Sequence, residues 1–98
     1  METYVILRRG GWRTAADLEE AAARSTAEGE RMADDIAWIR SYVLAEPDGS
    51  VGTVCIYQAS SPQAIRAHAT AADLPVDEII PVADTVIVRP DPKPVAAS

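Results

Sequence analysis

The sequence predicts an α+β domain, because segments rich in β-branched residues alternate with two alanine-rich segments of helical character. Glycine, proline and hydroxyl residues separate these segments where turns and helix starts are needed. The 98 residues suffice for one domain with a single small core. We therefore expect one domain over residues 1–90, followed by a flexible, proline-rich tail over residues 91–98.

A strand and then a helix are predicted in the N-terminal third. Residues 3–9 are dense in β-branched and aromatic side chains and stop at Gly10-Gly11, which is typical of a strand. Thr14 offers a hydroxyl N-cap to a helix over residues 15 to about 32. The inward stripe of this helix is mostly small, so we expect it to lie close on a sheet: Leu18, Ala22, Ser25, Gly29 and Met32.

A β-hairpin is predicted in the middle of the chain. Residues 36–45 and 52–59 are both rich in β-branched and aromatic side chains. The link between them contains Pro47, Asp48 and Gly49, which favour a tight turn. A short polar link between two such segments is typical of a hairpin.

A second helix and a final strand are predicted in the last third of the chain. Ser61 and Pro62 suit the N-cap and first position of a helix that ends near Pro75. Residues 78–90 follow as a strand, and Pro81 places its start at a sheet edge or bulge. The complete order predicts a ferredoxin-like βαββαβ sandwich, with a four-stranded antiparallel sheet and both helices on one face.

The face of the sheet without helices must meet solvent, a ligand or a partner. One alternating set of strand residues is aliphatic and suits the helices: Ile39, Val43, Val54 and Ile56. The other set is therefore expected on the open face, as a patch of aromatic, guanidinium and thiol groups: Trp38, Arg40, Tyr42, Cys55 and Tyr57. Such a patch predicts a homodimer packed through its sheets, a dimeric α+β barrel with a ligand pocket at the seam.

The single cysteine and the single histidine allow two interpretations. Cys55 lies in mid-strand, where a cysteine is commonly a small core residue, and its activation would need a cation such as Arg40. His68 lies beside the apolar stripe of the second helix, where a hydrogen-bonded structural role is commonest. As metal ligands the two are incomplete, because zinc takes about four ligands and nickel up to about six.

Composition excludes several classes of partner. The net charge is −6, with 15 acidic and 9 basic residues, which argues against nucleic acid. No apolar run approaches the roughly 20 residues that span a bilayer, and no basic amphipathic helix suggests a membrane surface. We expect a cytoplasmic protein, since no leader pattern is seen and one cysteine cannot close an internal disulfide.

Several short features of the sequence recur together in one family. They are Trp38, Ser41-Tyr42-Val43, Cys55, Tyr57, Ala59, Pro62, Ile65, His68-Ala69, Pro75 and Ile80-Pro81-Val82. In these features the chain resembles a small family of unknown function that is often labelled nickel-binding or nickel-responsive. The resemblance implies a ferredoxin-like fold and a dimer. Most of the histidine ligands are missing, because Arg8, Arg40 and Ala72 stand at their positions, and such an arginine favours an anion or carboxylate.

These observations predict a binding or sensing module for a small, anionic ligand or a metal ion, rather than an enzyme. The expected site residues are Trp38, Arg40, Tyr42, Cys55, Tyr57 and His68. Nickel or another divalent transition metal, if bound, is expected at His68 and Cys55. The alternative is a cofactor-free enzyme of the monooxygenase or isomerase type, with His68 as acid or base and Tyr57 or Tyr42 assisting. A third option is a relative kept only for protein–protein contact.

Overall fold

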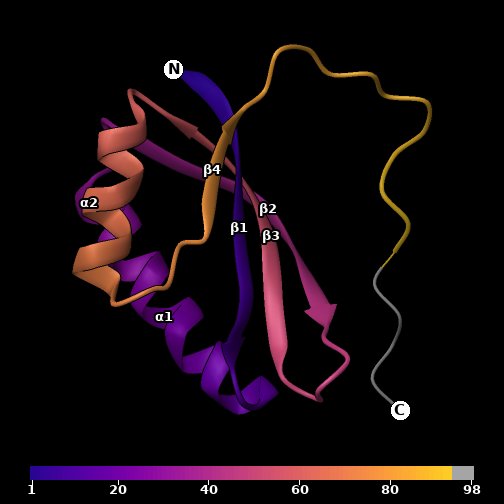
Figure 1. Cartoon of the computed structure of the whole chain (residues 1–98). Coiled ribbons are helices and arrows are strands. Elements are labelled where there is room, and N and C mark those ends of the chain that lie inside the picture. The colour runs from indigo at the N-terminus through magenta and orange to yellow at the C-terminus, as the bar shows by residue number, and fades with distance from the viewer. Residues whose placement is uncertain (94–98) are drawn as a thin grey trace.

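The chain folds in the predicted βαββαβ order (Figure 1). The structure is a computed structural model that describes residues 1–93. Its elements are β1 (Glu2–Trp12), α1 (Ala15–Arg31), β2 (Ile36–Ala45), β3 (Val51–Ala59), α2 (Pro62–Ala72) and β4 (Glu78–Pro81). The strands form an antiparallel sheet of order β2-β3-β1-β4, and both helices lie on one side of it. The predicted α+β, ferredoxin-like sandwich is confirmed.

Hydroxyl side chains begin both helices, as the sequence predicts. The Oγ1 atom of Thr14 accepts a hydrogen bond from the Asp17 amide at 3.2 Å, and Ser61 Oγ accepts one from the Ala64 amide at 3.1 Å. Asp73 ends α2 in the left-handed conformation, with φ of 54°. Neither helix within residues 1–93 is long and apolar enough to cross a membrane.

The last strand is much shorter than the predicted residues 78–90. β4 ends at Pro81, and the Val82 amide makes a final hydrogen bond to the Thr3 carbonyl at 2.9 Å. Because β1 begins at Glu2, it offers no further partner to the residues that follow. Residues 82–93 therefore leave the sheet as an extended segment, although the predicted tail of residues 91–98 lies partly outside the described residues (Figure 1).

A bulge in β2 decides which face its side chains occupy. Trp38 pairs with Tyr57, whereas Arg40 pairs with Ile56, so the register shifts at Ile39. Paired residues of antiparallel strands share a face. Trp38 therefore lies on the helix-covered face with Tyr57, and Arg40 lies on the opposite face with Ile56.

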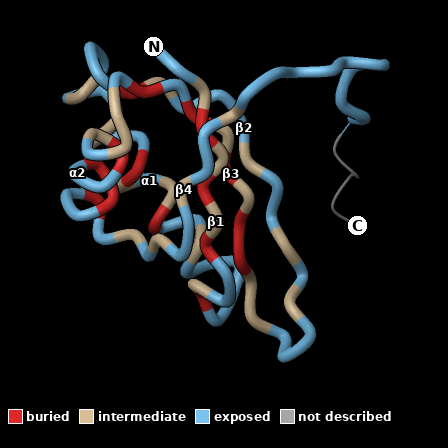
Figure 2. Tube along the Cα trace, turned by 45° about the horizontal axis from the view of Figure 1, so that its top comes forward, coloured by how far each residue is buried: buried red, intermediate tan, exposed pale blue. Residues whose placement is uncertain are grey.

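The core contains Cys55 and Tyr57, which the sequence placed on the open face. They are 4% and 1% exposed beneath the helices, whereas Ile39, expected under the helices, is 48% exposed. Figure 2 shows the buried positions alternating along β1 and β3. The predicted face is wrong for Trp38, Cys55 and Tyr57, because α1 packs with small residues, Ala21 and Ser25, which leave room for rings. Arg40 and Tyr42 lie on the open face, as predicted. The core cluster comprises Tyr4, Ile6, Ile36, Cys55, Tyr57, Ala59 and Ile65.

Candidate functional site

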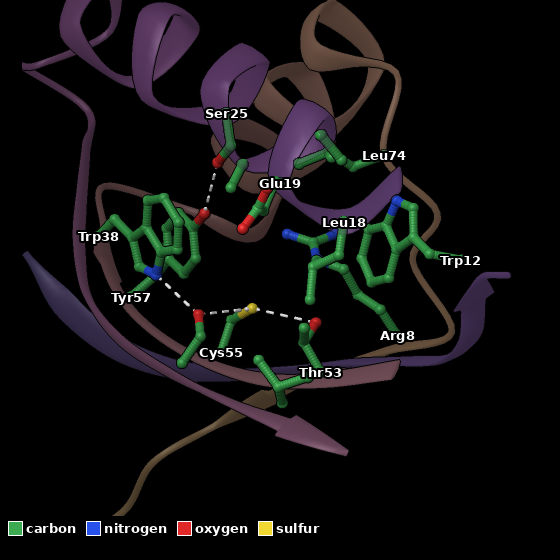
Figure 3. Close-up of a pocket in the computed structure, with 14 residues that line it drawn as sticks. Arg8, Trp12, Leu18, Glu19, Ser25, Trp38, Thr53, Cys55, Tyr57 and Leu74 are labelled. Atoms are coloured by element: carbon green, nitrogen blue, oxygen red, sulfur yellow. Dashed lines mark hydrogen bonds between the residues drawn. The ribbon is translucent and has the colours of Figure 1, made fainter. Parts of the chain in front are cut away.

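A cavity of about 290 Å³ lies between α1 and the helix-covered face of the sheet (Figure 3). Trp38 and Tyr57 stand at one end of it and Trp12 at the other. The α1 side is supplied by Leu18, Glu19, Ala21, Ala22 and Ser25. The sheet contributes Arg8, Ser41, Val43, Thr53 and Cys55, and Leu74 lies beside α2. Small helix residues opposite large rings thus leave an apolar space with few polar groups.

Arg8 is the polar group that stands out in this cavity. Its side chain is on the buried face of β1, 2% exposed, in line with Tyr4 and Ile6. Nη1 donates a hydrogen bond to the Pro75 carbonyl at 2.6 Å. Nη2 is also buried and has no hydrogen-bond partner within residues 1–93. A buried cationic nitrogen without a partner is costly, so this arrangement is typical of a binding site rather than of a packed core.

A chain of hydrogen bonds crosses the sheet side of the cavity (Figure 3). Trp38 Nε1 donates to Ser41 Oγ at 2.8 Å, and the Ser41 hydroxyl is 3.1 Å from Cys55 Sγ. The Cys55 thiol in turn donates to Thr53 Oγ1 at 3.3 Å. Each group in the chain donates its hydrogen bond to the next group along the sheet, and the Thr53 hydroxyl at the end remains able to donate. Thr53 is paired with Arg8 in the β1–β3 ladder, which places the two donors on the same face.

Tyr57 and His68 lie next to each other under the helices. The Tyr57 hydroxyl is 3.1 Å from Ser25 Oγ, its ring stacks on Trp38 with centroids 6.0 Å apart, and burial raises its pKa. The His68 ring is 5.7 Å from that of Tyr57, and its Nε2 lies 3.0 Å from the Ser25 carbonyl. A carbonyl only accepts, so Nε2 is the donor in this contact. His68 faces a second hollow of about 320 Å³, which shares Ser25, Trp38 and Tyr57 with the cavity around Arg8.

Arg40 and Tyr42 lie on the opposite face and do not join the other predicted site residues. Arg40 Nη1 donates to Asp91 at 2.6 Å, and the Tyr42 hydroxyl donates to the same carboxylate at 2.8 Å. The Tyr42 hydroxyl and the Arg40 guanidinium lower the pKa of Asp91. These two residues hold the C-terminal segment against the sheet, above a hollow of about 830 Å³. Of the six predicted site residues, the cavity beneath α1 contains Trp38, Cys55 and Tyr57.

The sequence reasoning missed Arg8 and Thr53 as members of the site. In the sequence, Arg8 stands at a position where the resemblance implies histidine, and an arginine there favours an anion or carboxylate. The sequence of β1 contains a pattern that indicates this role of Arg8: Tyr4, Ile6 and Arg8 occupy every second position and share the face opposite Val5. In addition, β1 is a central strand of the sheet. A central strand is covered by helices on one side, so an arginine in its buried set marks a polar group inside the fold.

The residues expected to hold a metal are not arranged as a metal site. His68 bonds to a carbonyl of α1, Cys55 bonds to Ser41 and Thr53, and the Tyr57 ring is adjacent to His68. Within residues 1–93 no group of three or more histidine, cysteine, aspartate or glutamate side chains is placed to hold a metal ion. The donors therefore do not fit nickel, which prefers several nitrogen and oxygen ligands around an open position.

Comparison with known proteins gives two related results. A family model described as "nickel responsive protein SCO4226-like" matches residues 4–82. Among solved structures, the crystal structure of SCO4226 from Streptomyces coelicolor A3(2) has a TM-score of 0.64 and 19% sequence identity, and covers 86% of this chain and 99% of that one. The structural similarity shows the fold. No curated protein matches the sequence.

Proposed function

This chain belongs to the family of nickel responsive SCO4226-like proteins, and we propose that it is a binding module for a small organic ligand. The proposed site is the cavity beneath α1 rather than the open face of the sheet. The observation that carries the proposal is Arg8, whose guanidinium points into this cavity and whose buried Nη2 has no partner within residues 1–93 (Figure 3). A ligand with a polar head would supply that partner.

The size and lining of the cavity support a small molecule. Its volume of about 290 Å³ lies just below the roughly 300–1,000 Å³ typical of ligand sites and suits a small ligand. Most of its wall is aromatic or aliphatic, and the polar groups gather at Arg8 and the hydroxyl–thiol chain. Apolar walls with a few convergent polar groups are typical of sites that orient one end of an organic ligand.

Metal binding and catalysis receive less support. The expected nickel ligands His68 and Cys55 bond to different partners, as described above. For the enzymatic alternative, Tyr57 lies beside His68, but Tyr42 is on the other face of the sheet. The His68 ring is 1% exposed and does not border the Arg8 cavity. An acid or base must reach the proton that it transfers, so the geometry favours binding over turnover.

We also propose that the protein is a homodimer associated through its open sheet face. Ile80, paired with Val5 on that face, is 38% exposed, and Tyr42 is 46% exposed. The departing segment carries Val86, Ile87 and Val88 at 76–85% exposure. Clustered exposed aliphatic groups of this kind favour association with a second copy. The helix-side cavity stays accessible in such a dimer.

The two tryptophans of the chain make the proposal testable, because both border the cavity. We expect members of a small-molecule fragment library to shift both indole N–H signals in ¹H–¹⁵N NMR spectra, with Trp12→Phe assigning the two peaks. Ala22→Leu fills the cavity and should abolish these shifts. Ala23→Leu, one residue along on the exposed side of α1, is the matched control. A folded protein whose indole signals do not respond to any fragment would overturn the proposal.

A further inference from the structure

We infer that the ligand of the α1 cavity is a small apolar monocarboxylate whose carboxylate is bound by Arg8 and Thr53. This inference rests on the proposed function and adds the chemical class of the ligand. It starts from the pairing of the two residues, which are direct neighbours on β1 and β3 and share the helix-covered face. Both are buried, at 2% and 4% exposure.

The two residues can present hydrogen-bond donors to the cavity. Nη1 of Arg8 is used by the Pro75 carbonyl, which fixes the guanidinium and leaves Nη2 to donate. Thr53 Oγ1 accepts a hydrogen bond from Cys55, and its own hydroxyl proton has no acceptor within residues 1–93, so it can donate to a ligand. One cationic N–H and one O–H side by side match the two oxygens of a carboxylate, and charge-assisted bonds of this kind are short and strong.

The charges around the cavity limit the ligand to a single negative charge. Arg8 is the one cationic side chain among the lining residues, and Glu19 on α1 also borders the space without forming an ion pair to Arg8 within residues 1–93. A phosphate dianion would meet Glu19 and only one guanidinium, and the chain as a whole carries a net charge of −6. A monocarboxylate is neutralised by Arg8 alone.

The rest of the ligand is apolar. From Arg8 the cavity extends between the Trp12 ring and the Trp38–Tyr57 stack, under Leu18 and the alanines of α1 (Figure 3). Within this part the Trp38 N–H is already bonded to Ser41, and the Tyr57 hydroxyl is bonded to Ser25. A phenyl ring or a branched alkyl group fits such walls, whereas a sugar or a polyol would leave its hydroxyls without partners.

Matched ligands test the class directly. We would titrate the full-length protein with 3-phenylpropanoate, with the neutral 3-phenylpropanamide and with inorganic phosphate, following both indole signals and the heat of binding. We expect the carboxylate to bind at least about tenfold more tightly than the amide, and phosphate to leave the signals unchanged. Arg8→Gln should remove the preference for the acid, whereas Arg66→Gln on the exposed side of α2 should keep it. Thr53→Val should weaken acid binding and Thr53→Ser should restore it.

The outcomes separate this inference from the proposed function. Equal affinities for the acid and the amide would overturn the inference that the ligand is a carboxylate. Binding of other fragments without binding of the acid would overturn it too. Either result would leave the proposal of a ligand-binding cavity intact. Indole signals unmoved by every compound would overturn both. If Arg8→Gln does not fold, Arg8→Lys retains the charge, and the ratio of acid to amide affinity in the unaltered protein still decides the question.

Discussion

At the scale of single residues, the buried guanidinium of Arg8 lowers the stability of the fold and, in the proposed site, binds the ligand. Its guanidinium is buried with a hydrogen bond on Nη1 and without one on Nη2 in the described part of the chain. In the absence of ligand, the desolvation of this charge opposes folding. In the proposed complex the ligand would supply the missing interaction, so the free energy lost in folding would be recovered as affinity.

Arg8→Met is therefore expected to stabilise the ligand-free protein. Methionine keeps the length and apolar packing of the side chain but removes the uncompensated charge. We expect the free energy of unfolding, measured by urea denaturation, to rise by about 1 to 2 kcal/mol. Arg66→Met, on the exposed surface of α2, should change it by less than about 0.5 kcal/mol. A clear loss of stability in Arg8→Met would mean that the charge is compensated in the free protein.

Tyr57 makes the stability of the fold depend on alkaline pH. Burial raises the pKa of its hydroxyl above the ordinary value of 10.0, so the unfolded chain ionises first as pH rises. The stability contributed by the neutral hydroxyl is full below pH 10 and declines above it. We expect the unfolding free energy, measured from pH 8 to 11, to fall less steeply in Tyr57→Phe than in the parent protein. Parallel curves would contradict this assignment.

At the scale of elements, two glycines occupy very different surroundings. A Cβ added at Gly29 of α1 would lie 3.8 Å from His68 Nε2, an ordinary contact, whereas one at Gly52 of β3 would lie 2.5 Å from the Arg8 carbonyl oxygen. We expect Gly29→Ala to raise the unfolding free energy by about 0.5 to 1 kcal/mol through helix propensity. Gly52→Ala should lower it by about 1 to 3 kcal/mol, because the backbone of β1 must move. Thermal melts of the two variants should therefore shift in opposite directions.

The sequence predicts the elements well and the faces of the sheet poorly. Thr14, Ser61 and the hairpin turn act through neighbours in the chain, and these local signals place the helices and β2–β3 correctly. The bulge at Ile39 depends on the pairing of β2 with β3, which no local pattern specifies. If side chains are assumed to alternate strictly through Ile39, and the bulge is ignored, Trp38 is assigned to the wrong face. Arg8 and Thr53 become neighbours only through the register of β1 and β3, so the residue pattern of either strand alone does not predict their site.

At the scale of the whole molecule, the sheet separates two different surfaces. The helix side contains the cavity, and the open side carries exposed apolar groups together with the segment held by Asp91. A ligand on one side and a partner copy on the other would not compete for the same residues. The family match ends at Val82, where the last hydrogen bond to β1 is made, so the departing segment lies outside the matched residues.

The proposed dimer is tested most directly by a charge on the open face. Ile80→Asp places a carboxylate beside Val5, and we expect it to convert a dimer into a monomer in light scattering after size exclusion at micromolar concentration. Ala71→Asp, on the exposed side of α2, adds the same charge and should leave the dimer intact. A parent protein that is monomeric at that concentration would contradict association through the sheet.

The reactivity of the hydrogen-bonded Cys55 thiol reports how often α1 separates transiently from the sheet. An alkylating reagent such as iodoacetamide reaches a sulfur that is 4% exposed only when α1 lifts from the sheet. The modification rate of this sole cysteine therefore measures how often the two layers separate. A molecule seated beneath α1 holds the layers together, so it protects the sulfur in proportion to its occupancy.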